Sequence, residues 1–314
     1  MKVIFMGTPD FAVPCLEGLI KDKNHEVVGV FTQPDRRKGR GKKMQGTPVK
    51  TLAEEENIPV YQPEKLNTPE SYEILKNINA DIFVVVAYGQ ILSKEMLELP
   101  PYGAVNVHAS LLPKYRGAAP IHWAIINGEE TTGITTMQMN EGLDTGDMLL
   151  QEGISIGDED TTGDLHDRLA LLGKKLLVET LNKLEEKSIT PTPQPEEGSS
   201  YAPKISKALA EIDWSTSAKE IYNLIRGLSP FPGARTRYQE KSLKIHRARW
   251  IEEEHSADPG MILEVSKEGI LVAAGKGKIQ ITELQLSGKK RMGVSEFLAG
   301  NSLEVHGKLG ARDE

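Results

Sequence analysis

The stretch of residues 104–120, AVNVHASLLPKYRGAAP, constrains most strongly how this chain can fold. Two valines alternate with Asn106 and His108, and a period of two predicts a β-strand. Side chains two residues apart leave a strand on the same face, so Asn106 and His108 should project side by side. Pro113 and Gly117 follow, and both residue types break regular strand pairing. The strand is therefore expected to end soon after His108.

An amide and an imidazole at the carboxyl end of a buried strand suggest a reactive site, because open α/β sheets bind their ligands at that edge. The alternative is that Asn106 and His108 only satisfy buried backbone groups. The strand by itself does not separate these two interpretations.

The chain opens with a βαβ pattern. An apolar run ends at Gly7, a helical stretch begins at about Asp10, and residues 26–32 form the next expected strand. Residues 82–87, IFVVVA, form the most apolar strand and the one expected at the centre of the sheet. These patterns predict an α/β fold with an open, mostly parallel, Rossmann-like sheet. The turn after Gly7 lacks Gly-x-Gly-x-x-Gly spacing, so a dinucleotide site is poorly supported.

A second, β-rich region is predicted after residues 190–200, TPTPQPEEGSS, whose composition predicts a linker. We therefore assign 1–189 to a catalytic domain, 190–206 to the linker and 207–314 to a C-terminal domain. Short strands separated by glycine-rich turns predict a small β-barrel in the C-terminal domain. These strands are expected at 243–249, 261–265, 270–274 and 279–286.

Charge is distributed unevenly along the chain. Of 38 Lys and Arg and 45 Asp and Glu residues, 18 and 15 lie from Tyr201 onward, so the net charge is −10 before that residue and +3 after it. The change of sign suggests an anionic partner for the second part. The one cysteine, Cys15, falls in an apolar helical stretch and suits a reducing cytoplasm. No apolar run reaches the ~20 residues of a membrane span, and we expect no signal peptide.

Residues 34–46, PDRRKGRGKKMQG, contain six basic residues and three glycines. The segment has no apolar periodicity and is expected to be an exposed, mobile loop. A run of cations on a loop usually marks only a solvated surface. Here the loop follows the second expected strand, on the ligand side of a parallel sheet, in a part of the chain that is otherwise acidic. We therefore favour binding of a polyanion.

The ten residues HASLLPKYRG, at 108–117, closely resemble the signature of the folate-dependent formyltransferases. The resemblance extends to FMGTPDFA at 5–12, to the basic segment, to AYGQIL at 87–92 and to GLDTGD at 142–147. The matching segments are scattered through the first half of the chain. A match of mixed polar and apolar residues over this length is far more specific than a single glycine motif.

The resemblance implies an enzyme that moves the formyl group of 10-formyltetrahydrofolate to the amino group of methionyl initiator tRNA, and that carries an oligonucleotide-binding-like barrel at its C-terminal end. We expect a cytoplasmic monomer that binds no membrane. The positions that match the family's catalytic residues are Asn106, His108 and Asp144. Those expected to hold the folate are Tyr88, Gly89, Gln90, Ile91, Leu92, Ser110, Leu111, Leu112 and Pro113. Those expected to contact tRNA are Arg36, Arg37, Lys38, Arg40, Lys42, Lys43, Lys204 and Lys207.

Formyl transfer is an acyl transfer to an amine, which needs donors for an oxyanion and groups that move protons from the amine and to the leaving nitrogen. Asn106 can donate to the oxyanion, and His108 can donate there or transfer a proton. Asp144 can orient the imidazole or accept a proton from the amine through water. Which of His108 and Asp144 handles which proton stays open. No His-x-x-x-His or Cys-x-x-Cys spacing is present, and we predict no metal.

Two other functions stay open. The same chemistry could act on a small amine, such as a nucleotide or a nucleotide-sugar, or the chain could be a non-enzymatic RNA-binding protein. A small amine gives no reason for the basic segment or for the positive charge of the second part. The intact set of Asn106, His108 and Asp144 argues against a protein without the chemistry.

Overall fold

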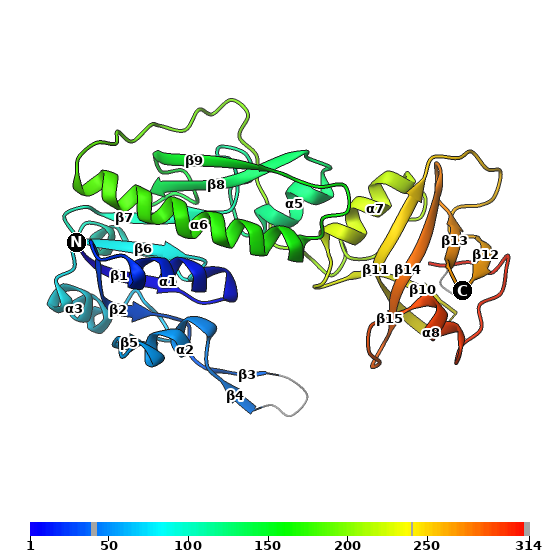
Figure 1. Cartoon of the computed structure of the whole chain (residues 1–314), viewed down its shortest axis with the longest axis horizontal. Helices are drawn as coiled ribbons and strands as arrows, with labels where there is room; N and C mark the ends of the chain where they lie inside the picture. Colours follow the sequence, from blue (N-terminus) through cyan, green and yellow to red (C-terminus); the bar gives the residue numbers. More distant parts are fainter. Residues whose placement is uncertain (39–42, 240, 311–314) are drawn as a thin grey trace. The chain divides into compact units, whose positions relative to one another are not determined.

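The computed structural model describes residues 1–38, 43–239 and 241–310 (Figure 1). The chain divides into two compact units. The first contains residues 1–117, 132–154 and 166–202, and the second contains residues 118–131, 155–165 and those from 203 onward. The boundaries assigned from the sequence, at 189 and 207, stay a prediction.

The first unit is built around a seven-stranded sheet. In spatial order its strands are β5 (Val60–Tyr61), β2 (Glu26–Phe31), β1 (Lys2–Gly7), β6 (Ile82–Val86), β7 (Ala104–His108), β8 (Thr131–Gln138) and β9 (Met148–Ser155). The strands from β5 to β7 run parallel, whereas β8 runs antiparallel to β7. The expected open, mostly parallel sheet is confirmed, and the most apolar strand, β6, lies at its centre.

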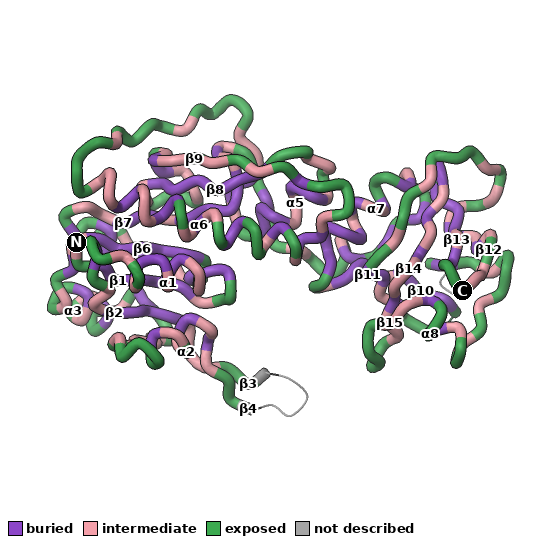
Figure 2. The backbone as a smooth tube through the Cα atoms, viewed as in Figure 1, coloured by how far each residue is buried: buried purple, intermediate pink, exposed green. Residues whose placement is uncertain are grey.

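Helices cover both faces of this sheet, and its central strands are buried (Figure 2). One face is covered by α1 (Val13–Lys21) and α6 (Thr162–Glu185). Helix α6 lies close to β7, because a Cβ atom at Gly173 of α6 would lie 3.2 Å from the Val107 side chain. On the other face, α3 (Pro69–Ile78) and α4 (Lys94–Leu97) contribute to a core with β1 and β6. Burial on both sides explains why these strands are continuous apolar runs rather than alternating ones.

Two helices of the first unit begin at a threonine whose hydroxyl oxygen accepts a hydrogen bond from the backbone N–H three residues later. Thr47 caps α2 (Pro48–Glu55) and Thr68 caps α3, and in both helices a proline takes the first position. Directly before α1 the chain also forms a short 3₁₀ helix, η1 (Asp10–Ala12). Within the described part of the chain, no helix is both long enough and apolar enough to cross a membrane.

The basic segment 34–46 is more regular than expected. Its described parts form an antiparallel ladder of β3 (Arg36–Lys38) and β4 (Lys43–Gln45). The expectation of a loop is therefore wrong for these residues, whereas Arg36, Arg37, Met44 and Gln45 are exposed as expected. A two-stranded ribbon that buries neither face has no apolar alternation, so its sequence gave no sign of strands. Arg40 and Lys42 lie outside the described residues.

The second unit contains a six-stranded antiparallel sheet. Its strands are β10 (Ala234–Tyr238), β11 (Lys241–Ile251), β14 (Lys278–Leu286), β13 (Gly269–Ala273) and β12 (Ile262–Ser266) in spatial order, with β15 (Met292–Gly293) paired to β14. The described part of this unit includes α5 (Pro120–Ile126), α7 (Ala218–Gly227) and α8 (Val294–Leu298). A capping box formed by Ser217 and Glu220 begins α7. Four of the strands match those expected from the sequence.

The C-terminal segment joins the two edges of this antiparallel sheet. The Gly310 N–H donates to the Arg237 carbonyl on β10, and the His306 N–H donates to the Ile262 carbonyl on β12, both over 2.8 Å. A short stretch of chain thus bridges both edge strands and closes the sheet into the predicted small barrel.

Gly133 of β8 lies where β9 passes very close. A Cβ atom at this position would overlap the carbonyl oxygen of Glu152 and approach the Leu111 side chain to 2.6 Å. We expect Gly133→Ala to lower the free energy of unfolding by about 1–3 kcal/mol, because overpacking forces the strands apart. Urea unfolding measures this as a lower midpoint. Gly153→Ala on β9 is the matched control, since its Cβ would lie an ordinary 3.6 Å from the Thr132 carbonyl; equal midpoints in the two variants would contradict the close approach.

Candidate active site

Asn106 and His108 lie at the carboxyl edge of the parallel sheet, as the sequence predicts. Because β6 and β7 are parallel neighbours, the loops that follow them, residues 87–92 and 109–117, leave the sheet at the same edge. Alternation along β7 directs Asn106 and His108 to the face opposite Val107, away from α6.

Asp144 reaches these residues by an indirect route. β8 is antiparallel to β7 and its Gln138 pairs with Val105, so the turn 140–147 leaves from the amino end of β7. Even so, Asp144 Oδ2 accepts the Gly117 backbone N–H over 2.8 Å. The turn must therefore fold back along the face of the strand.

The three predicted catalytic residues lie together. Asn106 Nδ2 donates to Asp144 Oδ1 over 3.4 Å, and His108 Nδ1 lies 3.7 Å from Asp144 Oδ2. His108 is 6% exposed and the Asp144 side chain 15% exposed, so water has limited access. The structure brings the three side chains together, and their catalytic roles stay a prediction.

The other ring nitrogen of His108 sets the position of its proton. Nε2 lies 2.9 Å from the Tyr115 carbonyl oxygen, and a carbonyl oxygen only accepts hydrogen bonds. The neutral imidazole therefore carries its proton on Nε2 and leaves Nδ1 as an acceptor beside Asp144. Two acceptors 3.7 Å apart can share a proton or bind a proton-bearing group such as an amine.

A glycine is required at position 117. Gly117 has a φ of +111°, and a Cβ atom there would lie 3.0 Å from the Ala202 carbonyl oxygen. A side chain would strain the backbone and push it away from residue 202. This explains why the resemblance ends on a glycine at the point where the backbone must donate to Asp144.

The loop 87–92, expected to hold the folate, is joined to neighbouring segments. The Tyr88 carbonyl accepts hydrogen bonds from Thr8 Oγ1 over 2.9 Å and from Gln33 Nε2 over 3.2 Å. The Tyr88 ring is buried, and burial raises the pKa of its hydroxyl well above the ordinary value. Ile91, in contrast, is 79% exposed. Thr8 belongs to the segment FMGTPDFA that carries part of the resemblance, whereas no sequence pattern had marked Gln33 as part of this site.

The second expected folate segment, 110–113, is largely hydrogen-bonded within the protein. The Leu112 N–H donates to Thr135 Oγ1 over 3.1 Å, and the Leu112 carbonyl accepts from Gln151 Nε2 over 2.8 Å. Ser110 Oγ donates to the Lys114 carbonyl over 2.6 Å. These bonds make the segment rigid and leave its backbone with less capacity to bind a ligand.

The residues expected to contact tRNA fall into two groups that belong to different units. Arg36 and Arg37 are exposed on β3, where Arg36 forms an ion pair of 3.3 Å with Glu64 that is itself exposed. Lys204 and Lys207 are exposed in the second unit. An exposed ion pair contributes little to stability, so Arg36 remains available to another anion.

Nothing in the described residues points to a metal or to covalent catalysis by cysteine. Among residues 1–38, 43–239 and 241–310, no three His, Cys, Asp or Glu side chains gather as ligands; the expected absence of a metal stays a prediction. Cys15 is fully buried, and burial raises the pKa of its thiol to about 12. A neutral thiol is a poor nucleophile.

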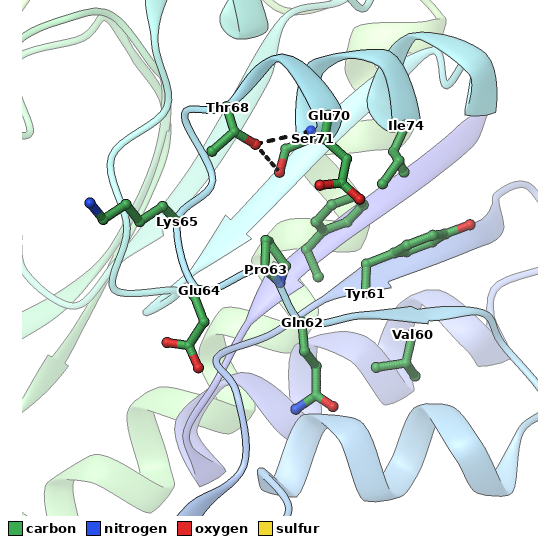
Figure 3. Close-up of a pocket in the computed structure, with 11 residues that line it drawn as sticks. Val60, Tyr61, Gln62, Pro63, Glu64, Lys65, Thr68, Glu70, Ser71 and Ile74 are labelled. Atoms are coloured by element: carbon green, nitrogen blue, oxygen red, sulfur yellow. Dashed lines mark hydrogen bonds between the residues drawn. The ribbon is translucent and has the colours of Figure 1, made fainter.

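A pocket of about 600 Å³ lies elsewhere on the first unit, at the ends of β2 and β5 (Figure 3). Residues 60–65, Phe31 and part of α3 line it. Its lining includes none of Asn106, His108 and Asp144. The candidate active site is therefore defined by the polar side chains of Asn106, His108 and Asp144, and this pocket is not part of it.

Comparison with known protein families adds a second line of evidence to this geometry. The pattern described as "Formyl transferase" matches residues 1–181, and "Formyl transferase, C-terminal domain" matches residues 204–302. The chain belongs to the formyl transferase family.

Relatives in this family match almost the whole chain. The chain is 56% identical over 310 residues to the methionyl-tRNA formyltransferase of Alkaliphilus oremlandii, with 99% of this chain and 100% of the relative covered. It is 53% identical over 310 residues to the methionyl-tRNA formyltransferase of Clostridium novyi, with 98% and 100% covered.

A solved structure has a similar fold. The N-formyltransferase from Helicobacter canadensis, in complex with folinic acid and dTDP-3-aminofucose, is 22% identical and has a TM-score of 0.67, covering 90% of this chain and 99% of that one. At this identity the likeness concerns the fold alone, and it agrees with the fold class expected from the sequence.

The geometry at His108 predicts a measurable tautomer. We expect the neutral ring to carry its proton on Nε2, because that atom faces the Tyr115 carbonyl. The ¹⁵N spectrum of histidine-labelled protein at alkaline pH measures this, with the signal assigned by its disappearance in His108→Gln. His166 is the internal contrast, since its Nδ1 lies 2.9 Å from the Asp167 carboxylate and should carry the proton instead. A neutral His108 protonated on Nδ1 would contradict the geometry.

Proposed function

We propose that this member of the formyl transferase family transfers the formyl group of 10-formyltetrahydrofolate to the amino group of methionyl initiator tRNA, for translation initiation. The observation that carries the proposal is 56% identity to a methionyl-tRNA formyltransferase over 99% of the chain. Such similarity extends through the second unit as well as the sheet. We also propose that the protein acts in the cytoplasm as a monomer.

The two alternatives are less well supported. Formylation of a small amine gives no reason for the cations on β3 or for the net charge of +3 from residue 201 onward. A non-enzymatic RNA-binding protein gives no reason for three polar side chains held together at the carboxyl edge of the sheet.

The polar groups of the site suit each step of the transfer. The amine nitrogen forms a bond to the formyl carbon, the bond from that carbon to the folate nitrogen breaks, the amine loses one proton and the folate nitrogen gains one. In our proposal, Asn106 Nδ2 donates to the developing oxyanion. His108 Nδ1 and Asp144 Oδ2, 3.7 Å apart, receive the proton of the amine and return one to the leaving nitrogen.

The surroundings of the site fit a flat folate ring. Ile91 and Leu143 are large apolar side chains, 79% and 62% exposed, on the loop 87–92 and the turn 140–147. A bound ring would remove such surface from water. We propose that backbone groups of residues 88–92 bind the ring, and that the rigid segment 110–113 mainly packs against it because its backbone is already hydrogen-bonded.

The basic ribbon and the second domain are proposed to bind the tRNA. Arg36, Arg37, Lys38, Arg40, Lys42 and Lys43 concentrate positive charge within a part of the chain whose net charge is −10. The remaining contacts are proposed for Lys204, near the end of the linker, and Lys207, at the start of the domain proposed at 207–314. Phosphate contacts of this kind supply affinity without reading sequence.

The direct test is incubation with 10-formyltetrahydrofolate labelled in the formyl group, together with methionyl initiator tRNA. The proposal expects labelled formyl-methionine after the ester bond to tRNA is hydrolysed. A parallel reaction contains an amino-sugar nucleotide in place of the tRNA. Label in the sugar and none in methionine would support the small-amine alternative, and tRNA binding without any transfer would support the non-enzymatic one.

Substitution of Asp144 tests its role in proton transfer. We expect Asp144→Asn to lower kcat about 10²–10⁴-fold, because general acid–base groups contribute this much, while a folate analogue still binds. Asp147→Asn is the matched control, because Asp147 is exposed in the same turn and has no contact with His108 among the described interactions. Near-normal turnover in a folded Asp144→Asn protein would remove Asp144 from the mechanism.

Salt dependence tests the proposed tRNA contacts of the ribbon. We expect Arg37→Gln with Arg40→Gln to flatten the log–log dependence of kcat/KM on salt by roughly 0.7–0.9 for each phosphate that the ribbon no longer neutralises. Kinetics between about 50 and 200 mM salt measure the slope. Lys94→Gln with Lys175→Gln removes the same charge from lysines that are 59% and 63% exposed on helices. Equal slopes in the two double variants would restore the interpretation of a merely solvated surface.

A further inference from the structure

Gln194 contacts the turn that carries Asp144. Gln194 is half-buried, whereas all the other residues between 190 and 198 are exposed. Its Nε2 donates to the backbone carbonyl of Asp144 over 2.8 Å and to that of Gly146 over 2.7 Å. An amide nitrogen has two hydrogens, so both are used, and one side chain ties two points of the turn.

Arg116 fixes the orientation of that amide. Arg116 Nε donates to Gln194 Oε1 over 3.0 Å, and Arg116 is only 3% exposed. A flipped amide would set its NH₂ against a guanidinium N–H and its oxygen against two carbonyls, so the partners allow only the observed orientation. Arg116 directly precedes Gly117, whose N–H holds the Asp144 carboxylate. The same short stretch thus holds Asp144 by its side chain and, through Gln194, by its backbone.

The turn needs such support for two reasons. Asp144 has a φ of +52°, in the left-handed region that residues other than glycine rarely adopt. The turn also leaves from the amino end of β7 and folds back along the strand, since Gln138 pairs with Val105. Hydrogen bonds between the two strands of a hairpin do not hold its turn against a third strand. Contacts from another segment must therefore hold this turn along β7.

Gln194 is itself fixed by main-chain bonds on both sides. Thr192 and Met148 exchange two N–H···O bonds of 2.8 Å. Further along, the Arg116 N–H donates to the Ser200 carbonyl over 2.8 Å, and the Ala202 N–H donates to the Arg116 carbonyl over 2.7 Å. The side-chain amide of Gln194 therefore reaches the turn from a segment that main-chain hydrogen bonds hold in place on both sides.

We propose that Gln194 is a positioning residue that keeps Asp144 Oδ2 beside His108 Nδ1. It touches no reacting atom and acts through the backbone of the turn. The proposal rests on the proposed function, because it takes Asp144 as part of the reacting site.

The test is Gln194→Glu, which keeps the length of the side chain and an acceptor for Arg116 but removes both donors to the turn. We expect kcat to fall roughly tenfold to hundredfold, as for a displacement of about 1 Å at a reacting group, with the KM for folate changed by less than about twofold. Amide hydrogen exchange should become faster in residues 140–147. Gln194→Asn, with the same amide on a shorter side chain that cannot span both carbonyls, should give a smaller fall in kcat.

Thr192→Ala is the matched control, because Thr192 lies on the same segment, is exposed and pairs with Met148 through its backbone. It should retain wild-type kcat and exchange. Wild-type kcat and exchange in a folded Gln194→Glu protein would overturn the proposal, as would an equal fall in kcat in Thr192→Ala. Failure of the wild-type protein to formylate methionyl-tRNA overturns the proposed function instead, and hydrogen exchange then still tests the hold on the turn.

Discussion

The hydrogen bond from the Gly117 backbone N–H to the Asp144 carboxylate joins the two loops on which the site depends. One loop follows β7 and carries the chain away from His108. The other connects two antiparallel strands and would otherwise stay at the opposite end of β7. A backbone donor aimed at a carboxylate is a strong, charge-assisted bond, and here it sets where the negative charge of the site lies. Asn106 and His108 form a three-residue polar site only because Asp144 is held beside them.

The hold on Asp144 is shared between chain segments that have different roles elsewhere. Gly117 closes the signature stretch, and Gln194 belongs to a segment whose composition predicts a linker. Most residues of this segment are exposed, which agrees with its polar composition. Its backbone is nevertheless hydrogen-bonded to Met148 and Arg116. The segment predicted as a linker therefore also binds the turn that carries Asp144.

The site is assembled from ordinary polar groups, and its capacity for catalysis comes from their arrangement. The Tyr115 carbonyl leaves only Nδ1 of His108 as an acceptor, and Asp144 lies beside that atom. A low exposure of both residues limits competition from water. Acyl transfer between two nitrogens requires a donor for the oxyanion and a place for one proton at a time, and an amide, an imidazole and a carboxylate supply these.

The sequence by itself determined the features that depend on neighbouring residues. The periodicity of β7, the apolar run of β6 and the capping residues Thr47 and Thr68 are local signals, and the structure has each element where they indicate. The strands of the second unit were visible for the same reason. Asn106 and His108 were found because residues two apart on a strand share a face, and Asp144 because its segment resembles that of a known family.

Only the tertiary structure decided how distant segments meet. The fold-back of the turn 140–147, the tautomer of His108 and the contact of Gln194 with a residue 50 positions earlier all depend on bonds between segments that are far apart in the chain. The ribbon of β3 and β4 was missed because a ladder that buries neither face has no apolar alternation. Local patterns report which side chains a segment must bury. They do not report which backbone groups another segment will bind.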